Sequence, residues 1–128
     1  MHNPVIDEDG NKFWYNKQGQ LHREDGPAYE WATGRKEWYL NNQLHRSIDA
    51  FRTKRWLNEQ GELHRLDGPA VEYLNGDKRW YLNGQRHRED GPAYEEANGY
   101  KSWYLNGQKY TEEEFALLQF MNGVNIYA

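Results

Sequence analysis

The chain repeats one short pattern along most of its length, and this repetition constrains its fold more than any other feature. One segment, of the type HRxDGPA with one residue before it, occurs in four copies, one of them degenerate, which begin at Leu21, Leu44, Leu63 and Arg86. A second segment, of the type KxWYLN, occurs three times, beginning at Lys36, Lys78 and Lys101. Residues 12–46 also align without a gap with residues 54–88. The sequence therefore predicts a repeat protein with a unit of about 23 residues.

Each unit is typical of a β-hairpin. The first strand is expected at residues 28–32, 70–74 and 93–97, where apolar or aromatic positions alternate with polar ones. A glycine-containing turn follows at residues 33–34, 75–76 and 98–99, and we expect positive φ at both of its residues. The KxWYLN segment supplies the second strand. The predicted hairpin units are residues 4–22, 23–45, 46–64, 65–87 and 88–110.

The HRxDGPA segment has a structural interpretation. The aspartate before Gly-Pro favours an Asx turn, the glycine supplies freedom of φ, and the proline fixes its own φ. The arginine can pair with this aspartate or stack on a neighbouring tryptophan. We assign structural roles, including burial of the tryptophans, to Trp38, Trp80, Trp103, His22, His64, His87, Asp25, Asp67 and Asp90.

The end of the chain departs from the repeat. Thr111 and Glu114 have the spacing of a capping box, and apolar residues follow at helical intervals. Asn122 and Gly123 would close this helix. We predict a helix over residues 111–122 that covers the end of the array, as terminal units of repeat proteins must. The alternative is a helix that docks onto a partner.

Composition favours a thin sheet. Apolar residues make up 37% of the chain and aromatic residues 16%, with a mean hydropathy of −1.22. Wide aromatic rings, and not a thick aliphatic core, would hold such a sheet together. The predicted fold is therefore mostly β, an elongated twisted antiparallel sheet of repeated β-hairpins with a C-terminal capping helix.

Charge and residue content exclude several classes of function. The net charge of −4 argues against nucleic-acid binding, which needs a basic excess. No apolar run reaches the roughly 18 residues of a membrane span, and residues 1–10 lack a signal-peptide pattern. We therefore expect a cytoplasmic protein without a membrane contact. Without cysteine, the chain has no thiolate metal site.

The repeat resembles the MORN family of short β-hairpin repeats. The similarity lies in the unit length, the glycine turns and the paired aromatics at residues 38–39, 80–81 and 103–104, and it covers residues 12–110. The HREDGPA segment departs from the usual MORN pattern. It is more similar to variant repeats of phage and large DNA-virus proteins, and more distantly to bacterial antitoxin-type variants. The resemblance implies an elongated twisted sheet and a role in scaffolding or protein binding.

Histidines near aspartates raise the question of a metal site. Equivalent residues of successive hairpins lie two strands apart, or about 10 Å, which is too far for one zinc ion. No sequence motif of a hydrolase, phosphate loop or zinc protease is present. We expect no metal, no cofactor and no enzymatic activity.

The repeat breaks at residues 47–55, where the DGPA segment is lost and the hairpin is shortened. Basic side chains gather here beside an aromatic one. This basic-aromatic patch could dock an acidic partner, or it could reflect the decay of one copy. The candidate partner-binding residues are Phe51, Arg52, Lys54 and Arg55.

The leading hypothesis is a non-enzymatic protein that binds a partner protein of unknown identity. On the resemblance, it is a phage or viral factor that inhibits or sequesters a host protein in the host cytoplasm. One alternative is a sponge for a small, nucleotide-like ligand that stacks on the aromatic ladder. Another is a structural self-assembly or antitoxin-type module, a homo-oligomer formed through the sheet edges.

Overall fold

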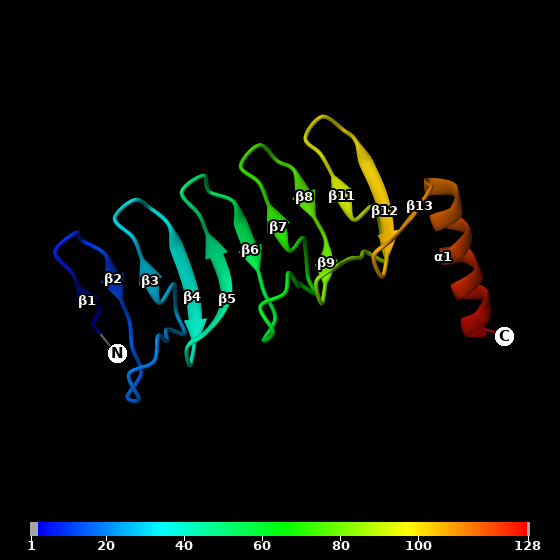
Figure 1. Cartoon of the computed structure of the whole chain (residues 1–128). Helices are drawn as coiled ribbons and strands as arrows, with labels where there is room; N and C mark the ends of the chain where they lie inside the picture. The colour runs from blue at the N-terminus through cyan, green and yellow to red at the C-terminus, as the bar shows by residue number, and fades with distance from the viewer. Residues whose placement is uncertain (1–2, 128) are drawn as a thin grey trace.

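The chain forms one long antiparallel sheet that ends in a helix, as Figure 1 shows for this computed structural model. The structure describes residues 3–127, with side chains up to residue 122. Thirteen short strands are present among the described residues. They are β1 (Val5–Ile6), β2 (Lys12–Phe13), β3 (Tyr29–Glu30), β4 (Lys36–Leu40), β5 (Gln43–Ile48), β6 (Lys54–Trp56), β7 (Val71–Glu72), β8 (Lys78–Arg79), β9 (Tyr81–Leu82), β10 (Gln85–Arg86), β11 (Tyr94–Glu95), β12 (Lys101–Leu105) and β13 (Gln108–Tyr110).

The order of the strands in space follows the order of the chain. The main sheet runs from β1 to β8 and continues through β11, β12 and β13, while β9 and β10 form a separate small hairpin. Consecutive strands pair antiparallel, so the turns lie alternately at the two ends of the strands (Figure 1). The predicted mostly-β hairpin array with a C-terminal helix is confirmed.

Two rows of side chains cross the main sheet on opposite faces, because successive strand residues point to opposite sides. One row alternates lysine with glutamate over much of its length: Ile6, Lys12, Glu30, Lys36, Ile48, Lys54, Glu72, Lys78, Glu95 and Lys101. We call this face of the sheet the Lys–Glu face. The row on the other face is Val5, Phe13, Tyr29, Glu37, Ser47, Arg55, Val71, Arg79, Tyr94 and Ser102.

The core of this sheet is thin. Small residues of the DGPA segments, Ala28, Ala70 and Ala93, are fully covered, and no large side chain among the described residues is. Trp14 is buried, but Trp38, Trp80 and Trp103 are half-buried, so the expectation that these three are buried was wrong. A single sheet leaves a ring partly in contact with solvent, because no second layer of structure covers it.

The two kinds of turn differ from the expectation. At residues 41–42, 83–84 and 106–107 both turn residues have positive φ, as in a type I′ turn. At the glycine-containing first turns, residues 33–34, 75–76 and 98–99, only the glycine has positive φ, for example Gly76 at 100°. Here Gly76 N–H donates to the Tyr73 carbonyl and Tyr73 N–H to the Asp77 carbonyl, which closes a three-residue loop. The positive φ predicted for Thr33, Asn75 and Asn98 was therefore wrong.

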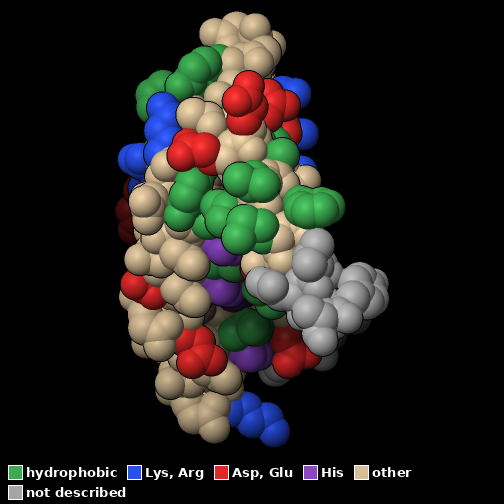
Figure 2. All heavy atoms as spheres, turned by 90° about the vertical axis from the view of Figure 1, so that its right-hand side faces the viewer, with side chains coloured by type: hydrophobic (Ala, Val, Ile, Leu, Met, Phe, Trp, Pro, Cys, Tyr) green, Lys and Arg blue, Asp and Glu red, His purple; other side chains and the backbone are tan. Residues whose placement is uncertain are grey.

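The helix α1 (Glu112–Tyr127) begins with the predicted capping box, in which Glu114 N–H donates to Thr111 Oγ1 and Thr111 N–H to Glu114 Oε1. It extends beyond the expected end at residue 122, so Asn122 and Gly123 do not close it. Phe115 is buried against the last hairpin, whereas Leu117, Phe120 and Met121 are exposed. Figure 2 shows hydrophobic side chains gathered at this end of the molecule.

Candidate functional site

The turn between β5 and β6 is held rigid by one aspartate. Asp49 Oδ1 accepts hydrogen bonds from the backbone N–H groups of Phe51 (2.9 Å) and Thr53 (3.0 Å). Its Oδ2 accepts a hydrogen bond from Arg55 Nη1 at 2.9 Å. Burial alone would raise the pKa of Asp49, but the Arg55 bond and the two N–H donors lower it below its usual value.

The first turn of the chain has the same construction. Asp7 Oδ1 accepts hydrogen bonds from the N–H groups of Asp9 and Asn11, at 3.0 and 2.9 Å. Arg52 has a φ of 63° where Gly10 has 85°. The break in the repeat at residues 47–55 is therefore no shortened hairpin. It is the first turn of a second two-hairpin block, with an arginine in the position of a glycine.

The four predicted binding residues do not form one patch. Phe51 and Arg52 are exposed at the tip of the turn, with Phe51 exposed by 82%. Lys54 and Arg55 are half-buried neighbours in β6, so their side chains point to opposite faces of the sheet. Lys54 belongs to the Lys–Glu face. Arg55 lies on the other face, bound to Asp49.

The HRxDGPA segments build one repeated unit, which we call the Arg–Trp clamp. In each copy the arginine stacks on a tryptophan, with its Cζ 3.9–4.0 Å from the ring centroid, and donates from Nε to the aspartate at 2.9–3.0 Å. Its Nη1 donates to the proline carbonyl at 3.1 Å. The three clamps are Arg23 with Trp14 and Asp25, Arg65 with Trp56 and Asp67, and Arg88 with Trp80 and Asp90.

The glycines of the clamps serve a purpose other than the one expected. Gly26, Gly68 and Gly91 lack positive φ. A Cβ on Gly68 would lie 3.0 Å from the Cζ of Arg65, so glycine leaves room for the stacked guanidinium. The aspartate side chain binds this arginine, and no Asx turn of the expected kind is recorded among the described residues.

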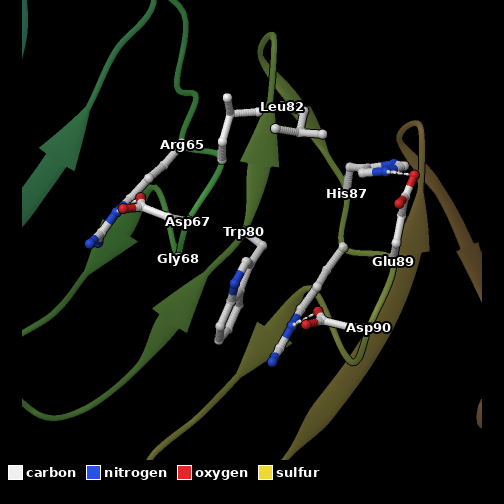
Figure 3. Close-up of a pocket in the computed structure, with 10 residues that line it drawn as sticks. Arg65, Asp67, Gly68, Trp80, Leu82, His87, Glu89 and Asp90 are labelled. Atoms are coloured by element: carbon white, nitrogen blue, oxygen red, sulfur yellow. Dashed lines mark hydrogen bonds and ion pairs between the residues drawn. The ribbon is translucent and has the colours of Figure 1, made fainter.

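A surface groove lies between two successive clamps. Figure 3 shows Trp80 between the Arg65–Asp67 pair on one side and Asp90 on the other, with Leu82 and His87 along the same groove. The arginine over Trp80 already covers one ring face, which limits stacking by a ligand. Leu66, in the same groove, is exposed by 84%.

A hydrogen bond explains why a histidine stands at the same position in three copies of the repeat. Nδ1 of His22, His64 and His87 accepts a hydrogen bond at 2.9 Å from the N–H of Asn41, Asn83 and Asn106 respectively. Each of these asparagines has positive φ in the next type I′ turn. The histidines thus tie neighbouring hairpins together, which supports their assigned structural role.

The degenerate copy of the segment, which begins at Leu44, lacks these hydrogen-bond partners among the described residues. Burial, followed by the charge of Arg46, lowers the pKa of His45, and its Nε2 is buried without a hydrogen-bond partner among the described residues. Arg46 stacks between Trp38 and Trp56, at 4.4 and 4.9 Å, and its Nε is also buried and unpartnered. Sequence reasoning missed Arg46. The available signal was the sequence HRSI, which lacks the aspartate of HRxD.

Two tyrosines of the opposite face, Tyr39 and Tyr94, are held in their protonated form. Burial, followed by the hydrogen bond to Glu37, raises the pKa of Tyr39 to about 12. Burial and the neighbouring Tyr81 likewise raise the pKa of Tyr94 to about 12. Phenols with such pKa values are poor general bases near pH 7.

Among the described residues, no three side chains of the metal-binding types come together as a metal site. No described helix has the length and apolar character needed to cross a membrane. No protein-family model, curated protein or solved structure matches the chain. The similarity to MORN repeats thus stays a prediction from the sequence.

Proposed function

We propose that this chain is a non-enzymatic protein that binds a partner protein through the β5–β6 turn. The observation that carries the proposal is Phe51, a large apolar side chain exposed by 82% on a turn fixed by Asp49. Aromatic side chains are frequent hot spots of protein interfaces. A rigid turn loses little conformational entropy on binding, which favours affinity.

The charge of the turn defines the partner's chemistry. Arg52 is exposed beside Phe51, and Lys54 lies at the base of the turn. An acidic partner surface with an apolar pocket would complement this arrangement. Arg55 contributes less, because Asp49 already binds its guanidinium.

The sequence resemblance extends the proposal to the biological setting. Phage and large DNA-virus proteins contain similar repeats, so we propose that the partner is a host protein that this chain inhibits or sequesters in the host cytoplasm. The repeats alone support this part of the proposal.

Self-assembly is a second candidate, favoured by one observation. Strand β1 pairs on one side only among the described strands, and its residues Val5 and Ile6 are exposed by 57% and 59%. Such an edge can pair with a second chain. Light scattering coupled to size-exclusion chromatography tests it: a mass that stays monomeric at high concentration would exclude it. The small-ligand alternative has less support, because arginines cover faces of the tryptophan rings.

Affinity capture with matched variants tests the binding proposal. Phe51→Ser and Arg52→Glu should lose a protein captured by the wild-type chain, without a lower melting temperature. Leu74→Ser is the control, since Leu74 is an apolar residue exposed by 72% on another first turn. Loss of the captured protein in the control, or its retention by both turn variants, would refute the turn as the binding surface.

A further inference from the structure

Arg46 occupies the position of a clamp arginine but lacks the carboxylate that completes each clamp. Arg23, Arg65 and Arg88 each bind an aspartate two residues further on. Two residues after Arg46 stands Ile48. Among the described residues, Arg46 forms no ion pair with a carboxylate, and Glu72 acts on it only by longer-range attraction.

The guanidinium of Arg46 is nevertheless held in place. The rings of Trp38 and Trp56 flank it at 4.4 and 4.9 Å, and Nε is covered. The residue as a whole is half-buried, so part of its side chain remains in contact with solvent. A planar donor fixed between two rings is well suited to bind a carboxylate, because little freedom remains to be lost.

The charge pattern around Arg46 changes at the same point. Along the Lys–Glu face, Ile48 stands where a glutamate would continue the alternation, and it pairs with Lys36 on one side and Lys54 on the other. Arg46 lies two residues from Ile48 in the same strand and therefore shares its face. Glu30 and Glu72 pair with the far sides of the two lysines. Near Arg46, Arg65 adds positive charge and Glu72 adds negative charge. Strand β5 itself contributes Arg46 to this face and no carboxylate.

We infer that Trp38, Arg46 and Trp56 form a binding site for a carboxylate of an acidic peptide segment, with Ile48 as an apolar contact and Lys36 and Lys54 as flanking cations. The chain itself shows the preference, since the three equivalent arginines all bind carboxylates. Lys36 and Lys54 lie two strands apart, or about 10 Å, so a segment with several carboxylates can reach all three cations. This inference rests on the proposed partner binding and names the chemistry of the contact.

The test uses hexaglutamate as a probe, measured by calorimetry with the full chain at low salt. Wild-type protein should bind it saturably. Arg46→Met, which keeps the stem between the rings, should weaken binding about tenfold or more, the equivalent of about 1.4 kcal/mol. The control Lys78→Gln removes one charge from the same face outside the site and should change affinity by less than about threefold.

A second variant guards against unfolding of the first. Ile48→Asp supplies an internal carboxylate to Arg46, so it should keep or raise the melting temperature while it abolishes hexaglutamate binding. The inference is overturned if wild-type protein does not bind hexaglutamate, or if Lys78→Gln weakens this binding as much as Arg46→Met does. It is also overturned if inorganic phosphate displaces hexaglutamate as well as acetate does at equal ionic strength.

These outcomes are independent of the test at the turn. If hexaglutamate binds wild-type protein but not Ile48→Asp, the carboxylate site stands even when Phe51→Ser still captures every partner. If hexaglutamate does not bind while Phe51→Ser loses its partner, the turn surface stands and the carboxylate site falls.

Discussion

The backbone N–H of Asn106 donates to Nδ1 of His87 at 2.9 Å, across the junction between two hairpins. His87 is exposed by only 8%, and the bond is part-buried although Asn106 itself lies at the surface. We predict that His87→Phe, which keeps a ring but removes the acceptor, lowers the free energy of unfolding by about 1 kcal/mol. Urea denaturation measures it. His87→Asn, whose side-chain oxygen can accept a hydrogen bond, should recover part of the loss; equal stability of wild type and His87→Phe would contradict the role of the bond.

A methyl group at Gly68 should disturb the clamp above it. Its Cβ would approach the Cζ of Arg65 to 3.0 Å, so Gly68→Ala should displace the guanidinium from Trp56 and cost about 1–3 kcal/mol. A double-mutant cycle with Arg65→Gln isolates the effect, since Gly68→Ala should cost much less once the guanidinium is gone. An equal cost in both backgrounds would mean that the strain lies elsewhere.

Trp80 and Trp103 offer a comparison within one chain. Arg88 stacks on Trp80 at 3.9 Å, whereas no arginine is recorded over Trp103 among the described residues. Trp80→Ala should therefore lower the free energy of unfolding by about 3 kcal/mol, near the lower bound for large core rings because Trp80 is only half-buried. Trp103→Ala should cost less. Chemical denaturation of both variants decides, and the reverse order would argue against a contribution from the clamp.

The stability of the chain should depend on pH through His45. Burial, and then Arg46, hold the pKa of His45 below the usual 6.5, so the folded state binds fewer protons there than the unfolded state. This contribution to stability is complete above pH 6.5 and decreases as the pH falls below it. His45→Gln should flatten the decline of the melting temperature between about pH 7 and 5. Parallel curves for wild type and variant would show that His45 titrates alike in both states.

The sequence predicted the hairpin array because its signals were local. Strand alternation, turn glycines and the Thr111–Glu114 capping box depend on neighbours within a few residues. The pairing of arginine with aspartate and its stacking on tryptophan were both anticipated as alternatives, and the structure combines them.

Predictions from the sequence failed where the structure depends on contacts between separate segments of the chain. The role of Gly68 depends on the position of the Arg65 guanidinium above it, which sequence spacing does not reveal. The turn at residues 47–55 seemed degenerate because it was compared with the preceding hairpin, although its match is the first turn of the chain, around Asp7. The extension of α1 through Asn122 and Gly123 contradicts a local stop signal, and no described contact explains it.

Because strand order follows chain order, each strand contacts mainly its immediate neighbours, and α1 contacts mainly the last hairpin. A tension applied between the two ends of the sheet therefore passes through every strand pair in series. It acts along the inter-strand hydrogen bonds, which lie perpendicular to antiparallel strands, so the bonds are loaded one pair at a time. Under such a tension the sheet should open first at short strand pairs such as β8–β11, in which only two residues of each strand are paired. The hairpins should then separate one after another at low force.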